Sequence, residues 1–133
     1  MKRLFPATAL LASMALPAAL SPHPAVAGMA DVVAAEVEPE ATLGDETFYR
    51  FTVTVRHADE GWDHYADNFE ILAPDGTVLG TRVLAHPHEN EQPFTRSLGA
   101  VAVPDGIAEV TIRAHDSVHG NGGDTVTVTL PTR

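Results

Sequence analysis

The strongest constraint on the fold comes from residues 46–57, where apolar and polar side chains alternate along the chain. The apolar members are Tyr49, Phe51, Val53 and Val55, and the polar members are Arg50, Thr52, Thr54 and Arg56. A period of two places one set on a buried face and the other on a solvated face, which is typical of a β-strand that covers a core. His57 follows with the parity of the apolar set. We therefore expect it either at the rim of the core or as an inward-pointing ligand.

Short alternating segments separated by turn residues continue through the rest of the chain. Pro74-Asp75-Gly76 and Pro104-Asp105-Gly106 favour tight turns, because proline fixes φ and glycine accepts a positive φ. No segment after residue 27 shows helical periodicity. We predict an all-β fold, an immunoglobulin-like antiparallel β-sandwich of about seven strands. The expected strands are 31–38, 46–57, 68–73, 77–84, 94–103, 107–115 and 124–130, with a polar turn at 39–45.

The N-terminal region has the three parts of a secretory signal peptide. Lys2-Arg3 is a basic start, residues 4–20 are rich in Ala and Leu, and Ala25-Val26-Ala27 supplies the small residues of a cleavage site. We predict a signal peptide at 1–27 and a β-sandwich domain at 28–133, in a periplasmic or secreted protein without membrane attachment after cleavage. An uncleaved membrane anchor is the alternative. Because the chain has no cysteine, a lipoprotein is not expected.

The charge of the chain excludes several classes of partner. Its 18 acidic residues outnumber its eight lysines and arginines, for a formal net charge of −10. Loss of the leader removes Lys2 and Arg3 and leaves about −12. Such a surface repels nucleic acid and anionic membranes and attracts cations. The absence of cysteine rules out disulfides, so a packed core or a bound metal must stabilise a domain this small.

All histidines after the leader are expected at one end of the sandwich. Strands that run alternately up and down place every second loop at the same end, so the segments around 57–65, 85–93 and 115–123 share an end. The two Pro-Asp-Gly turns belong to the other end and contain no histidine. The histidines concerned are His57, His64, His86, His88, His115 and His119.

This grouping predicts a metal site. Imidazole binds Cu, Fe, Zn and Ni, and carboxylates in the same loops add oxygen donors and orient the rings. A structural or pH-responsive histidine cluster is the alternative, and Trp62 and Tyr65 are expected to plug the end of the sandwich. The predicted ligands are His57, His64, His119, His86, His88, His115 and Asp116, and the predicted metal is copper or iron, with zinc as a third option.

The order of these residues resembles the ferrous-iron domain of superoxide reductases, the desulfoferrodoxin and neelaredoxin group. The resemblance is carried by His57, His64-Tyr65, Phe69-Glu70-Ile71-Leu72, Asp75-Gly76 and Asp116-Ser117-Val118-His119-Gly120. It implies an immunoglobulin-like sandwich whose iron is held by four histidines and a cysteine. His57, His64 and His119 match three of those histidines, and Asp116 stands at the position of the cysteine. The chain is also similar in strand order to the sulfur-carrier partner subunit of thiosulfate oxidation.

Three functions follow from these patterns. The first is a secreted or periplasmic metal-binding protein, with copper preferred because Cu(II) binds most tightly in the series of divalent metals. The second is a metal oxidoreductase that resembles superoxide reductase. Whether the chain is an enzyme stays open, because Asp116 replaces the thiolate of that family. The third is a non-enzymatic module whose loops bind another periplasmic protein.

Overall fold

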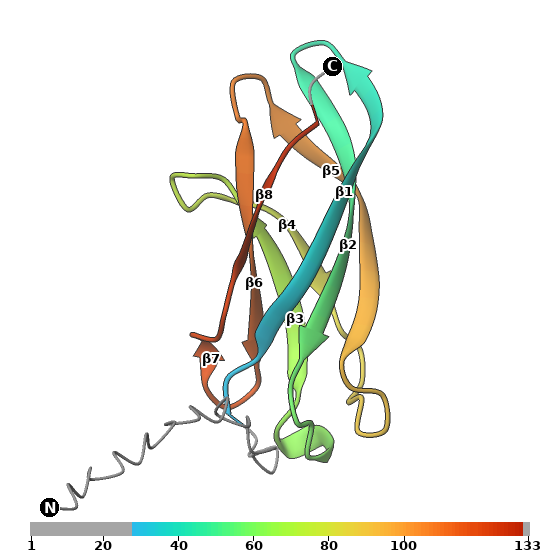
Figure 1. Ribbon diagram of the computed structural model, residues 1–133, viewed down its shortest axis with the longest axis vertical. Helices are drawn as coiled ribbons and strands as arrows, with labels where there is room; N and C mark the ends of the chain where they lie inside the picture. The colour runs from blue at the N-terminus through green and yellow to red at the C-terminus, as the bar shows by residue number, and fades with distance from the viewer. Residues whose placement is uncertain (1–27, 132–133) are drawn as a thin grey trace, which may run out of the picture.

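The structure, a computed structural model, describes residues 28–131, and most of them lie in two antiparallel sheets (Figure 1). The first sheet has the order β1-β2-β5, and the second has the order β4-β3-β6-β7 with β8 paired to β6. The strands are β1 (Asp31–Leu43), β2 (Glu46–Arg56), β3 (Ala66–Leu72), β4 (Val78–Val83), β5 (Phe94–Pro104), β6 (Glu109–Asp116), β7 (Gly120–Asn121) and β8 (Val126–Thr129). A short 3-10 helix, η1, spans Gly61–Asp63. The predicted all-β sandwich is confirmed, and the predicted signal peptide lies outside the described residues.

The core lies between the two sheets and follows the alternation of their strands. Phe51, Val53 and Val55 of β2 are completely buried and face Phe69 of β3 and Ile112 of β6. Burial of each such side chain stabilises the fold by roughly 1.5–3 kcal/mol. This packing fixes which face of each strand points inward. The alternation of inward and outward side chains continues past the apolar residues to the ends of β2 and β6.

Strand boundaries differ from the prediction mainly at β1. Residues 39–43 were expected in a turn, but they pair with β2 until Leu43 lies opposite Glu46. Their side chains are exposed, so backbone hydrogen bonding to β2 holds them in the strand although their composition is polar. Gly76 and Gly106 have φ angles of 88° and 93°, as the turn prediction requires. Ala108, which lies within the expected strand 107–115, is exposed and precedes β6, which begins at Glu109.

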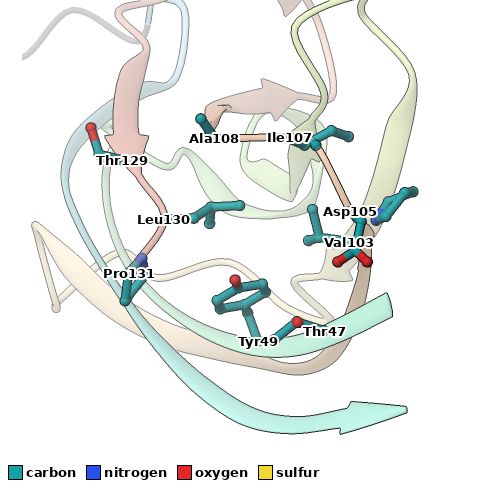
Figure 2. Close-up of a pocket in the computed structure, with 11 residues that line it drawn as sticks. Thr47, Tyr49, Val103, Asp105, Ile107, Ala108, Thr129, Leu130 and Pro131 are labelled. Atoms are coloured by element: carbon teal, nitrogen blue, oxygen red, sulfur yellow. The ribbon is translucent and has the colours of Figure 1, made fainter. Parts of the chain in front are cut away.

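The two ends of the sandwich are chemically different. The segments 57–65, 85–93 and 116–120 share one end, which we call the histidine end and which is the lower end in Figure 1. A cavity of about 240 Å³ lies at the opposite end, where Tyr49, Val103 and Leu130 are among the residues that line it (Figure 2). None of the residues that line this cavity is a histidine. It therefore lacks the nitrogen donors that the predicted site requires.

Candidate metal centre

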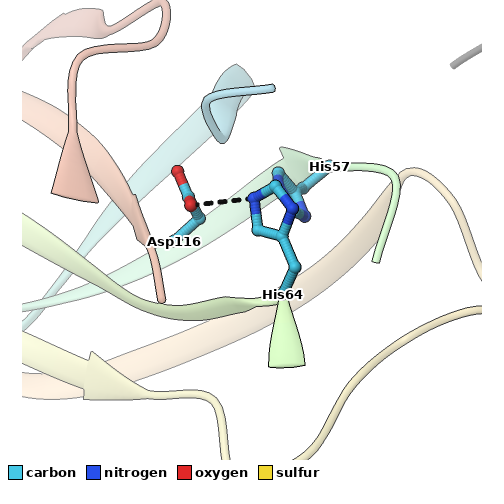
Figure 3. Close-up of side chains that lie close together, drawn as sticks. All are labelled: His57, His64 and Asp116. Atoms are coloured by element: carbon cyan, nitrogen blue, oxygen red, sulfur yellow. Dashed lines mark hydrogen bonds and ion pairs between the residues drawn. The ribbon is translucent and has the colours of Figure 1, made fainter. Parts of the chain in front are cut away.

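Three buried side chains meet at the histidine end with their donor atoms directed toward one another. His57 Nε2 lies 3.3 Å from His64 Nε2, and His64 Nε2 lies 3.0 Å from Asp116 Oδ1 (Figure 3). Within residues 28–131 these three form a group in which one donor atom from each lies within 4.8 Å of the others. Their exposed fractions are 3%, 8% and 0%. The group is therefore withdrawn from solvent, unlike an ordinary surface cluster of acids and histidines.

The strand parity of the core places two of these residues. His57 follows Val55 by two residues at the end of β2, and Asp116 follows Ala114 by two residues at the end of β6. Both side chains therefore point inward, on the same side as the apolar residues before them. His64 comes from the loop after η1, where its carbonyl accepts a 2.7 Å hydrogen bond from the Glu60 amide. Three separate segments thus converge on one buried point.

Asp116 is the shared acceptor of the group. Its Oδ1 atom accepts hydrogen bonds from the amides of Val118 and His119, at 3.0 and 2.8 Å. Burial by itself raises the pKa of Asp116, but the hydrogen bonds from His119 and Val118, together with the charge of His119, outweigh it and hold the pKa below its usual value. Its Oδ2 atom is buried without a hydrogen-bond partner among the described residues. A buried carboxylate with one unused oxygen is suited to bind a cation.

His119 adjoins the group from its outer side. Its Nδ1 atom lies 3.1 Å from Asp116 Oδ1, and its ring centroid lies 4.9 Å from that of His64. The His119 side chain is 36% exposed, whereas Asp116 is fully buried. A rotation of this ring could add a nitrogen donor, and its exposure makes His119 the side of the group that faces solvent.

Asp59, which the sequence analysis did not single out, fixes the orientation of His57. Its Oδ1 atom lies 2.6 Å from His57 Nδ1 and also accepts the Ala66 amide, and its Oδ2 atom accepts the His88 amide. A carboxylate only accepts hydrogen bonds, so His57 Nδ1 carries a hydrogen and Nε2 faces His64. Metal-binding histidines commonly donate their second nitrogen to a carboxylate in this way. The position of Asp59, two residues after His57, was the signal available in the sequence.

The spacing of the donor atoms matches a small metal ion. Ligands bound about 2.0–2.1 Å from a tetrahedral ion lie about 3.3 Å from one another. The distances of 3.3 Å from His57 to His64 and 3.0 Å from His64 to Asp116 are close to that value. Imidazole nitrogen and carboxylate oxygen are both ligands of Zn, Cu and Fe. The residues present therefore fit a transition-metal ion.

The remaining predicted ligands lie elsewhere at the histidine end. His115 has the opposite parity to Asp116, faces away from the core and pairs with Asp67. His86 is exposed, and its ring lies 4.5 Å from that of His88. His88 is 6% exposed and stacks on Phe94 with a centroid separation of 4.0 Å. Neither His115 nor the His86–His88 pair belongs to the group that His57 forms.

The aromatic residues of the β2–β3 loop do not close the end of the core. Trp62 is 67% exposed and makes an edge contact with Tyr65 at 5.6 Å. The expectation that it closes the end of the core was wrong, because His57, His64 and Asp116 occupy that position. Trp62 instead lies on the outer surface beside the buried group.

Comparisons with known proteins provide a relative but no family. No protein-family profile matches the chain, and no solved structure matches it. A protein of Halomicrobium mukohataei described as "Putative lipoprotein" is 44% identical to it over 78 residues. The match covers 59% of this chain and 38% of the relative, so the chain spans less than half of that protein's length. In the part of the chain that the structure describes, no helix is long and apolar enough to cross a bilayer.

Proposed function

We propose that this protein binds a transition-metal ion, with Cu(II) preferred, in the cell envelope or outside the cell. The observation that supports this function is the buried group of His57, His64 and Asp116, in which His64 Nε2 lies 3.3 Å from His57 Nε2 and 3.0 Å from Asp116 Oδ1, and all three donor atoms lie within 4.8 Å of one another. The name of the Halomicrobium mukohataei relative and the predicted leader favour the location. The net charge of −10 favours attraction of cations over anions.

The chemistry of the donor atoms favours Cu(II) as the bound metal. It contains imidazole and carboxylate groups and no thiolate, because the chain has no cysteine. Such donors suit Cu(II), Zn(II) and Fe(II), whereas Cu(I) prefers sulfur. Cu(II) forms the most stable complexes in this series, so it is the expected occupant where several metals compete. Asp59 would hold His57 in the orientation that the ion requires.

The test compares metal-free protein with two histidine variants. Titration with Cu(II) and Zn(II), followed by elemental analysis, should give one ion per chain, and His57→Ala should abolish tight binding. His86→Ala is the matched control, since His86 is exposed at the same end and does not contact the group. If the protein takes up no ion at micromolar concentration, or if His57→Ala binds as tightly as His86→Ala, the proposed function is wrong.

A second candidate function is the reduction of superoxide, as the resemblance described above implies. It is favoured by the position of His119, which is partly exposed and contacts the same carboxylate oxygen as His64. This would leave one side of a bound iron open to a small molecule. Faster loss of superoxide with iron-loaded protein than with free iron would support this function. A bound iron that does not change oxidation state in the presence of superoxide would exclude it.

A further inference from the structure

A backbone oxygen contributes a further donor atom to the same point. The carbonyl oxygen of Gly28 lies 2.9 Å from His57 Nε2, the nitrogen that also faces His64. Asp59 binds Nδ1 of His57, which leaves Nε2 as the ring nitrogen that faces the Gly28 oxygen. A lone pair and a carbonyl oxygen at this distance repel each other unless a proton or a metal ion lies between them. The 2.9 Å separation agrees with two ligands of one ion.

The position of Gly28 is set by the packing of the segment that follows it. Ala30 is 1% exposed, and the Val32 amide donates a 2.9 Å hydrogen bond to the Asp124 carbonyl. Gly123 approaches Ala30 so closely that a Cβ atom there would lie 2.0 Å from the Ala30 oxygen. The chain around residues 28–32 is therefore held against the loop before β8, with Gly28 directed at His57.

Gly28 is also the residue after the predicted cleavage site Ala25-Val26-Ala27. Cleavage of the Ala27–Gly28 peptide bond would convert the Gly28 nitrogen from an amide into a primary α-amine. This amine has a pKa of about 8, so a metal ion can displace its proton near neutral pH. The amine and the carbonyl oxygen of one residue can close a five-membered ring with a metal ion. A cavity of about 430 Å³ borders both Gly28 and His57 and leaves room for such an arrangement.

We infer that Gly28 completes the metal site with its carbonyl oxygen and, after removal of the leader, with its α-amine. This inference rests on the proposed function, because it assigns further donors to the same ion. It makes metal loading dependent on processing: a chain in which Ala27 is still attached lacks the amine donor. High-affinity binding would then be confined to the protein that has been exported and cleaved.

The experiment compares chains that differ only at their first residue, with Cu(II) alone as the probe. One chain begins at Gly28, the second begins at Ala27, and the third begins at Gly28 with its amine acetylated. The Gly28 chain should bind Cu(II) about tenfold or more tightly than the other two. Its electron paramagnetic resonance spectrum should show coupling to one more nitrogen. Thermal unfolding of the three metal-free chains should coincide, which excludes a difference in folding as the cause.

The outcomes separate this inference from the proposed function. If all three chains bind one Cu(II) with the same affinity and the same spectrum, Gly28 supplies no amine donor. The proposed metal site itself would still be supported by this result. If either modified chain retains the affinity of the Gly28 chain, the inference is likewise overturned. If no chain binds Cu(II), the proposed function itself is wrong and the inference with it.

Discussion

His57 and Asp59 form a 2.6 Å hydrogen bond between two completely buried side chains, only two residues apart in the sequence. This contact decides which nitrogen of His57 faces His64. The same carboxylate accepts the amides of Ala66 and His88, so it also joins the β2–β3 loop to the β4–β5 loop. Asp59 thus orients the candidate ligand and fixes the segments around it.

The first prediction concerns substitution of this carboxylate. Asp59→Asn preserves the size of the side chain but places an amide where His57 and two backbone amides require acceptors. We expect metal affinity to fall about 10- to 100-fold, as for other partners of metal-binding histidines. The metal-free protein should lose about 1–3 kcal/mol of its free energy of unfolding, because a buried donor is left unsatisfied. Calorimetric titration and urea unfolding measure the two effects.

Asp63→Asn is the matched control for this substitution. This substitution removes the same charge from the same loop, but the Asp63 side chain is exposed. If both variants lower the metal affinity equally, the effect of Asp59→Asn comes from the loss of charge, and an orienting role of Asp59 is excluded.

The second prediction tests whether Asp116 occupies the position of the cysteine in superoxide reductases. Asp116→Cys should place a thiolate beside His64 and His119 and give the Cu(II)-loaded protein a strong visible absorption band from sulfur-to-copper charge transfer. The metal-free variant should lose about 1–3 kcal/mol of stability, because the Val118 and His119 amides lose their acceptor. Absorption spectroscopy of the loaded protein provides the measurement.

Asp67→Cys is the control, since Asp67 also pairs with a histidine but lies outside the buried group. It should give no such band. A band in both variants, or in neither, would contradict the proposed position of Asp116.

Strand parity was the part of the site that could be predicted from the sequence. Alternation from Val55 to His57 places His57 on the core side, as the structure shows. The same rule applied to β6 separates its last two residues, with Asp116 inward and His115 outward. Both were predicted as ligands from their position at the same loop, without regard to strand parity. The alternation of β6 already distinguished them.

Other features depend on how distant segments pack, so no local pattern contains them. Gly28 reaches His57 only because the chain before β1 lies against the loop around Gly123. His88 is buried because its ring stacks on Phe94, although the polar composition of its segment is typical of a solvated loop. Asp59 accepts the His88 amide only because the β4–β5 loop lies beside the loop that carries Asp59. Each of these contacts requires the three-dimensional arrangement of the loops.

The third prediction concerns the pH dependence of stability. Burial lowers the pKa of His88 below its ordinary value of 6.5, and the charges of Arg96 and His86 lower it further. Neutral His88 therefore contributes stability that is fully present above its unfolded-state pKa and is lost as the pH falls through the lower folded-state pKa. His88→Phe keeps a ring against Phe94 and removes two buried ring nitrogens without partners. The metal-free variant should lose less stability than the wild type between about pH 7 and 5.

Urea unfolding at several pH values measures this difference, and His86→Phe is the control. The charge of His86 is a smaller cause of the lowered pKa of His88 than burial and Arg96, so His86→Phe should change the pH dependence less than His88→Phe does. Parallel stability curves for the wild type and His88→Phe would show that His88 takes up its proton equally in the folded and unfolded states, which would contradict the lowered pKa.

The fourth prediction ranks the candidate ligands through thermal unfolding. A metal that binds only the folded state stabilises it by about 2.7 kcal/mol when its free concentration is a hundred times the dissociation constant. Cu(II) should therefore raise the melting temperature of the wild type. His64→Ala should remove most of this rise, because His64 Nε2 lies within 3.3 Å of the facing atoms of both His57 and Asp116. His115→Ala should retain it, because His115 faces away from the group and pairs with Asp67. Equal loss of the rise in both variants would mean that the ion binds across the surface of the histidine end, outside the buried group.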